Sequence, residues 1–201
     1  MLVSEKKNRM YCVESTHRIE EIIKKSRFIG IIAPCSSEKE LLEILSRLRT
    51  DYPTASHIAF SYRIQSSKGI ASRFFDAGEP SGTAGKPIFQ HLEGKDLINV
   101  LLAVVRYFGG IKLGAGGLTR AYGGTAKKVI DGSSIVPYVE YRKIALQIEY
   151  SQLQPLGYQL KQLKGEIVEQ TFADKVAVVV RLPAECADAV ATQFAGKKSA
   201  D

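Results

Sequence analysis

The sequence predicts an α+β protein of two domains, one over residues 1–136 and one over residues 137–201. The chain has 201 residues, 45% of them hydrophobic, which suffices for one generous core or two small ones. Segments in which apolar residues alternate, as in strands, lie between segments in which they recur at helical spacing. After Pro137 these patterns restart, which indicates that a second folding unit begins there.

The first part of the chain alternates strand and helix patterns. Residues 26–35 form an apolar, β-branched run that predicts a strand. A serine then stands where it can cap a helix, whose leucines repeat at helical spacing through residues 36–53 until a proline ends it. Residues 56–64 and 70–75 predict two further strands, on either side of a turn rich in serine and glycine.

A short helix, a buried strand and a longer helix are predicted next. Residues 84–92 favour a helix, and the nearly continuous apolar run 97–108 favours a strand in its second half. In residues 109–131 a glycine-rich turn precedes a helical pattern, an arrangement that presents backbone N–H groups to an anion. Gly123 and Gly124 inside this helix each cost about 1 kcal/mol relative to alanine, so we expect a neighbouring strand or a ligand to approach closely there.

The C-terminal domain shows the order β-α-β-β-α. Residues 141–150 alternate as a strand, residues 152–163 have a helical leucine pattern, and residues 165–182 predict a hairpin. A final helix is predicted over residues 183–194. This order is that of a ferredoxin-like domain, which needs one more strand. Because residues 195–201 supply none, the last strand is expected to be truncated.

The formal net charge of +7 belongs to the N-terminal part of the chain. Of the 28 basic and 21 acidic side chains, eight of each lie in residues 139–201, so this part is neutral. Between Asp96 and Asp131 there is no acidic residue, and the basic residues there are Arg106, Lys112, Arg120, Lys127 and Lys128. Such a local positive field attracts phosphate-bearing partners, unless acidic side chains from elsewhere in the fold neutralise it.

A polar, glycine-rich loop, DAGEPSGTAGKP, occupies residues 76–87. It does not match the phosphate-binding loop G-x-x-x-x-G-K-[ST], because Pro80 and Pro87 stand at two of the fixed positions. The two acids of the loop could bind a metal, act as acid and base, or hydrogen-bond backbone amides and so fix the loop. The weak catalytic candidates of the chain are Asp76, Glu79 and Lys86.

Motifs for cofactors and metals are missing from the sequence. The three histidines and three cysteines lie in separate segments, without metal-ligand spacing or a nucleophile motif. The sequence therefore predicts no metal site and no cofactor, and it gives no positive sign of an enzyme. No apolar run approaches the roughly 18 to 20 residues of a membrane span, and the N-terminus carries charges where a signal peptide is apolar. A cytoplasmic protein without membrane contact is expected.

Two long motifs resemble the YigZ/IMPACT family, in its bacterial two-domain type. They are DAGEPSGTAGKP and, at residues 102–124, LAVVRYFGGIKLGAGGLTRAYGG. The resemblance covers nearly the whole chain and departs from bacterial relatives at the end, where the final strand is expected to be truncated. It implies an N-terminal β-α sandwich similar to a small-ribosomal-subunit protein and to domain IV of the translocation elongation factor. It also implies a C-terminal domain similar to domain V of that factor.

The resemblance further implies binding of RNA or the ribosome, linked to translation or its regulation, without an established catalytic activity. The eukaryotic relatives reach a kinase co-activator through a module for which this chain has no room, so that role is not expected. In the RNA-binding hypothesis, cations contact phosphates and Tyr107, Phe108 or Tyr122 stacks on bases. The candidate nucleic-acid or phosphate-binding residues are Arg106, Tyr107, Lys112, Gly114, Gly116, Gly117, Arg120, Lys127 and Lys128.

Two alternatives remain beside RNA binding. The first is an enzyme or binding protein for a phosphorylated compound, related to a kinase-like fold superfamily. In it the glycines 114–117 would hold phosphate, and Asp76, Glu79 and Lys86 would complete the site. The second is a protein-interaction module in which the neutral C-terminal domain meets a protein partner or another copy of the chain.

Overall fold

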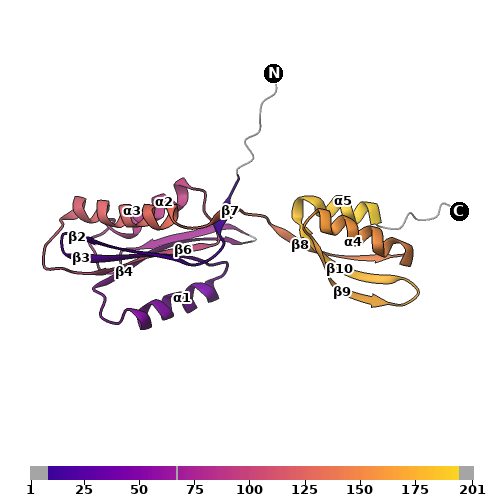
Figure 1. Cartoon of the computed structure of the whole chain (residues 1–201), viewed down its shortest axis with the longest axis horizontal. Helices are drawn as coiled ribbons and strands as arrows, with labels where there is room; N and C mark the ends of the chain where they lie inside the picture. The colour runs from indigo at the N-terminus through magenta and orange to yellow at the C-terminus, as the bar shows by residue number, and fades with distance from the viewer. Residues whose placement is uncertain (1–8, 67, 195–201) are drawn as a thin grey trace, which may run out of the picture. The chain divides into compact units, whose positions relative to one another are not determined.

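A five-stranded antiparallel sheet organises the N-terminal part of the chain (Figure 1). The computed structural model describes residues 9–66 and 68–194. The strand order is β2-β3-β6-β4-β5, so β6 lies at the centre of the sheet. The strands are β2 (His17–Ile23), β3 (Ser26–Pro34), β4 (His57–Ser66), β5 (Gly69–Phe75) and β6 (Val100–Tyr107).

Helices cover both faces of this sheet. Helix α1 (Glu38–Asp51) lies on one face, and α2 (Gly85–Gly94) and α3 (Ala115–Asp131) lie on the other (Figure 1). Each face has its own apolar core, and β6 contributes side chains to both. This double burial explains why the sequence of β6 is almost continuously apolar instead of alternating. Ser37 caps α1 by accepting a hydrogen bond from the Glu40 amide, as its position in the sequence predicts.

Three strands escape sequence-based prediction. The edge strand β2 has four charged or histidine side chains among its seven residues, and Ile22 on it is 74% exposed. Strands β1 (Tyr11–Val13) and β7 (Ile135–Pro137) are only three residues long and pair with each other antiparallel. Short or charged strands give too few apolar residues for a period to be visible, so only their tertiary pairing defines them.

The C-terminal part forms a separate α+β unit. The chain divides into two compact units between Tyr138 and Val139, two residues after the boundary expected from the sequence. The antiparallel sheet of the second unit has the order β8-β10-β9, and α4 and α5 pack with it around one core. Its elements are β8 (Tyr141–Ile148), a 3₁₀ turn (Tyr150–Gln152), α4 (Leu153–Gln162), β9 (Glu166–Phe172), β10 (Val176–Pro183) and α5 (Ala184–Phe194).

The two-domain α+β class is thus confirmed, while two finer expectations stay open. The truncated final strand of the ferredoxin-like domain falls on residues 195–201, which lie outside the described residues. The likeness to the ribosomal protein and to the elongation-factor domains stays a prediction from the family resemblance.

Close backbone packing explains one glycine pair of the sequence but not another. A Cβ atom on Gly109, just after β6, would lie 1.9 Å from the carbonyl oxygen of Lys25 in the turn between β2 and β3. By contrast, a Cβ on Gly123 would make ordinary contacts with α2, at 3.5 Å from His91 and 3.6 Å from Pro87. A Cβ on Gly124 would meet nothing within 4 Å. Neither a strand nor any other described segment therefore requires the two helical glycines.

We expect alanine to have opposite effects at Gly109 and Gly124. Gly109→Ala forces two backbone segments apart and should lower the free energy of unfolding by more than about 2 kcal/mol. Gly124→Ala gains helix propensity in open space and should raise it by about 1 kcal/mol. Urea unfolding followed by circular dichroism measures both, and a stabilised Gly109→Ala protein would show that the contact between these two turns is wrong.

Candidate nucleic-acid interface

Asp76 fixes the glycine-rich loop that connects β5 to α2. Its carboxylate accepts hydrogen bonds from three backbone amides, at 2.8 Å from Gly82, 3.0 Å from Ala84 and 2.8 Å from Gly85. Partial burial alone would raise the pKa of Asp76, but these three hydrogen bonds prevail and lower it. Of the roles considered for this acid, hydrogen bonding to the loop backbone is the one that the structure shows. Asp76 thereby satisfies the N-terminus of α2.

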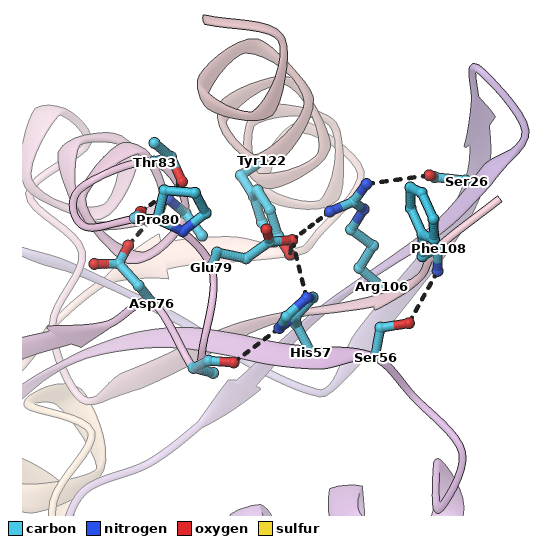
Figure 2. A network of polar contacts seen from close by, with 12 residues as sticks. Ser26, Ser56, His57, Asp76, Glu79, Pro80, Thr83, Arg106, Phe108 and Tyr122 are labelled. Atoms are coloured by element: carbon cyan, nitrogen blue, oxygen red, sulfur yellow. Dashed lines mark hydrogen bonds and ion pairs between the residues drawn. The ribbon is translucent and has the colours of Figure 1, made fainter. Parts of the chain in front are cut away.

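The side chain of Glu79 does not share that role. Its side chain is only 4% exposed, and its Oε1 atom accepts hydrogen bonds from Arg106 Nη1 at 2.6 Å and from Tyr122 Oη at 2.7 Å. His57 Nε2 lies 3.8 Å from the same oxygen (Figure 2). Glu79 therefore ties the loop to side chains of β4, β6 and α3, not to its own backbone.

Strand register places this network at the end of the sheet. Arg106 on β6 pairs with Phe28 on β3 and with His57 on β4, so the three side chains lie in one row on the α3 side of the sheet. His57 Nδ1 is 3.0 Å from the carbonyl oxygen of Ala77, which can only accept, so this nitrogen carries the proton. Burial and the neighbouring Glu79 carboxylate raise the pKa of Tyr122, which keeps its hydroxyl a donor.

Arg106 is held inside the protein on every side. Its guanidinium lies 5.5 Å from the ring centre of Phe28 and 5.4 Å from that of Phe108, and Nη2 is 3.3 Å from the hydroxyl of Ser26. Arg106 as a whole is 5% exposed, and its buried Nε has no hydrogen-bond partner within the described part of the chain. The charge of Arg106 is thus already neutralised by Glu79 and is not displayed to solvent.

A cavity of about 300 Å³ opens beside this network. The loop contributes Glu79 and Pro80 to its lining, and the segment leading into α3 contributes Lys112 and Gly114. Phe108, which is 50% exposed, also lines it. The glycine-rich loop and the start of the basic helix therefore converge on one site, as the phosphate-binding hypotheses require.

The N-terminus of α3 meets this cavity without a cap. Gly114 is the N-cap residue with φ +70°, and it provides no side-chain hydrogen bond. The first amide of the helix to find a backbone acceptor is that of Leu118, which bonds to the Gly114 carbonyl at 2.9 Å. The amides of residues 115–117 therefore have no acceptor within the helix, and the first turn contains no acidic residue. Such a terminus attracts an anion.

The structure separates the other predicted binding residues from this cavity. Lys127 pairs with Asp131 at 2.5 Å, and Lys128 pairs with Glu21 of β2 at 2.6 Å. Both lysines lie about 18 Å or more along α3 from Ala115, at 1.5 Å per residue. Acidic side chains from the fold therefore neutralise this part of the predicted positive surface. For these two lysines, the positive field expected from the sequence is thus cancelled within the protein.

The remaining candidates lie near the site or outside it. Gly116 and Gly117 belong to the first turn of α3, and Arg120 follows one turn later, exposed on the helix. Lys86 is exposed at the start of α2 and does not line the cavity. Tyr107 is covered by the guanidinium of Arg27, 5.3 Å from its ring centre.

Tyr122 cannot stack on a base, because it is fully buried on the core side of α3, so that suggestion is wrong. Sequence reasoning also missed His57 and Ser26 as parts of the network. Only the strand register, which the sequence does not reveal, brings them to Arg106. Within residues 9–66 and 68–194, no three His, Cys, Asp or Glu side chains gather where they could hold a metal ion.

We expect Asp76→Ala to destabilise the protein in a pH-dependent way. The lost hydrogen bonds should lower the free energy of unfolding by about 1 to 3 kcal/mol at neutral pH. Because the folded-state pKa of Asp76 is depressed, its contribution is present above the unfolded pKa, about 3.9, and is lost as pH falls through the lower folded value. Thermal unfolding of wild type and Asp76→Ala between neutral and acidic pH should therefore show that their difference in stability shrinks below about pH 4.

A matched control is Asp51→Ala, at the exposed end of α1, which should change stability by less than about 0.5 kcal/mol. If the loss of stability in Asp76→Ala were the same in acid as at neutral pH, the role of the ionised Asp76 carboxylate as hydrogen-bond acceptor would be contradicted.

Comparisons with known proteins agree with these motifs. The Impact N-terminal domain family matches residues 24–130, and a domain of unknown function, DUF1949, matches residues 146–195. An IMPACT family member encoded in the pol 5′ region of Thermus thermophilus is 38% identical over 162 residues, covering 81% of this chain and 87% of the relative. The IMPACT family member YigZ of Escherichia coli is 36% identical over 170 residues, covering 83% and 82%.

A solved structure has the same fold over nearly the whole chain. It is the crystal structure of a hypothetical protein, and it aligns with a TM-score of 0.68 and 28% identity, covering 95% of this chain and 98% of the other. No helix among the described residues has both the length and the apolar character needed to cross a membrane. The matched N-terminal domain and the relatives above 30% identity confirm the resemblance, and the chain belongs to the IMPACT family.

Proposed function

We propose that this protein binds single-stranded RNA at the cavity beside Arg106. The observation that carries the proposal is the meeting of three features in one place: the uncapped N-terminus of α3, Lys112 and the half-exposed ring of Phe108. A link of this binding to translation or its regulation is the expectation that the family resemblance adds. It belongs to the same proposal.

The charged features suit a phosphate of the RNA backbone. Lys112 lines the cavity together with Gly114 and Ala115, where α3 begins, so its ammonium and the positive end of the helix meet the same space. Lys112 has no acidic partner among the described residues, unlike Arg106, Lys127 and Lys128. A bound phosphate would accept hydrogen bonds from these donors without breaking an ion pair of the protein.

Phe108 favours an unpaired base over a duplex. A ring that is half exposed at a cavity offers a face on which one base can stack, and every base has such a face. The ring is also rigidly placed, because its backbone amide donates to the hydroxyl of Ser56 at 3.0 Å and the guanidinium of Arg106 packs against it. Bases in a double helix are stacked already and cannot reach such a ring.

We expect Lys112→Gln to weaken RNA binding and its salt dependence. Loss of one phosphate contact should reduce the slope of log K against log salt concentration by about 0.7, the value for single strands. Fluorescence anisotropy with a labelled single-stranded RNA of mixed sequence measures this at several salt concentrations. Lys127→Gln is the matched control, because Lys127 is bound to Asp131 far from the cavity and should leave the slope unchanged. Undetectable binding at low salt, or equal slopes for wild type and Lys112→Gln, would refute the site.

A phosphorylated small molecule is the second candidate, favoured by acid and base groups at the same place. Glu79 lines the cavity, and His57 lies 3.8 Å from its carboxylate. A thermal-shift series with nucleotides and inorganic phosphate, with and without magnesium, tests this candidate. Stabilisation by a nucleotide at concentrations where RNA has no effect would favour it over RNA binding. A protein partner of the C-terminal unit stays a prediction, which pull-down with and without residues 139–201 tests.

A further inference from the structure

We infer that the cavity discriminates among bases, and that Glu79 makes it prefer a base that has an amino group to uracil. This inference rests on the proposed function, because it assigns a role to one wall of the same cavity. It names the chemistry that is read: an exocyclic amino group on the Watson–Crick edge of an unpaired base.

The two oxygens of the Glu79 carboxylate have different surroundings. Oε1 accepts from Arg106 and Tyr122 and faces His57, so its acceptor capacity is used by the protein. Oε2 receives no hydrogen bond from any residue that the structure describes. Among the described residues, the fully buried side-chain atoms that lack a hydrogen-bond partner are Ser61 Oγ and Arg106 Nε. Oε2 lacks a partner but is not one of these atoms, so it is not fully buried. The small accessible part of this side chain therefore includes Oε2.

Glu79 is one of the residues that line the cavity, and a ligand there would find Oε2 as the free oxygen of its carboxylate. A carboxylate oxygen that is nearly removed from water and has no donor is costly, and a ligand N–H group relieves that cost. The hydrogen bond from Arg106 at 2.6 Å holds the carboxylate in one place, so its free oxygen is an acceptor at a fixed position. A group that can only accept distinguishes ligands by their donors.

The four bases differ at this point. Cytosine, adenine and guanine each have an exocyclic amino group that can donate to a carboxylate, whereas uracil places a carbonyl oxygen where cytosine has its N4 amino group. The one donor on this edge of uracil, N3–H, lies between two carbonyl oxygens, and the Glu79 carboxylate would repel the one that it faces. The other walls do not discriminate, since Phe108 stacks on any base and Lys112 and the α3 amides bind phosphate. Glu79 is thus the specificity-determining residue of the site.

The comparison of cytidine and uridine octamers tests this inference, because the two bases have the same size and differ at this edge. We expect wild type to bind the cytidine octamer about 10-fold more tightly, within the range of one good base contact. Glu79→Gln replaces the carboxylate by an amide that can also donate, so the preference should fall below about 2-fold. Lys112→Gln is the control: it should weaken both octamers and preserve their ratio. Circular dichroism of each variant checks the fold.

If Glu79→Gln does not fold, Glu79→Asp serves instead, since it retains the charge but withdraws the oxygen by one methylene, and the same loss of preference is expected. Equal, salt-dependent binding of both octamers by wild type overturns base discrimination and leaves RNA binding intact. Failure of both octamers to bind overturns the proposed function itself. Binding of CMP as tight as that of the cytidine octamer, with UMP weaker, supports the role of Glu79 and assigns the site to a free nucleotide instead of RNA.

Discussion

The N-terminal unit depends on a cation buried at the end of its central strand. Arg106 follows Leu102 and Val104 along the core face of β6, where an apolar side chain would ordinarily stand. An unpaired charge in this position would be severely destabilising, and removing one member of a buried pair typically costs about 3 to 5 kcal/mol. Glu79 is therefore an obligatory partner, and the loop that carries it must close over the sheet. The shape of residues 76–87 follows from this requirement.

The same requirement explains why two distant motifs of the sequence form one feature. DAGEPSGTAGKP supplies Glu79, and the segment beginning RYFGG supplies Arg106, Phe108 and the close turn at Gly109. Ser26 binds the second motif at two points. Its hydroxyl accepts hydrogen bonds from Arg106 Nη2 at 3.3 Å and from the Gly109 amide at 3.2 Å. The loop, the strand end and the turn between β2 and β3 are thus parts of one scaffold, and the cavity is its open side.

Sequence patterns predicted the elements with strong periodicity and failed where partners are remote. The leucines of α1 and the apolar run of β6 reveal their elements because burial sets their spacing. The pairing of Lys127 with Asp131, four residues apart on a helix, is also readable from the sequence. The pairing of Lys128 with Glu21 is not, because 107 residues separate them. Because both faces of β6 are buried, no alternation shows on which side Arg106 lies, and composition alone placed it on a basic surface.

The three helices of the N-terminal unit show why the start of α3 has the character of a binding site. Ser37 caps α1 and is followed by acids in the first turn, and the Asp76 carboxylate satisfies the first amides of α2. Helix α3 has neither, although Asp or Ser at position 114 would be the ordinary solution. Gly114, with a positive φ, provides no side-chain oxygen, and Gly116 and Gly117 bring none to the first turn. Because side chains supply an acceptor at the start of α1 and of α2, the open terminus beside Lys112 is best explained by an acceptor that comes from outside the N-terminal unit.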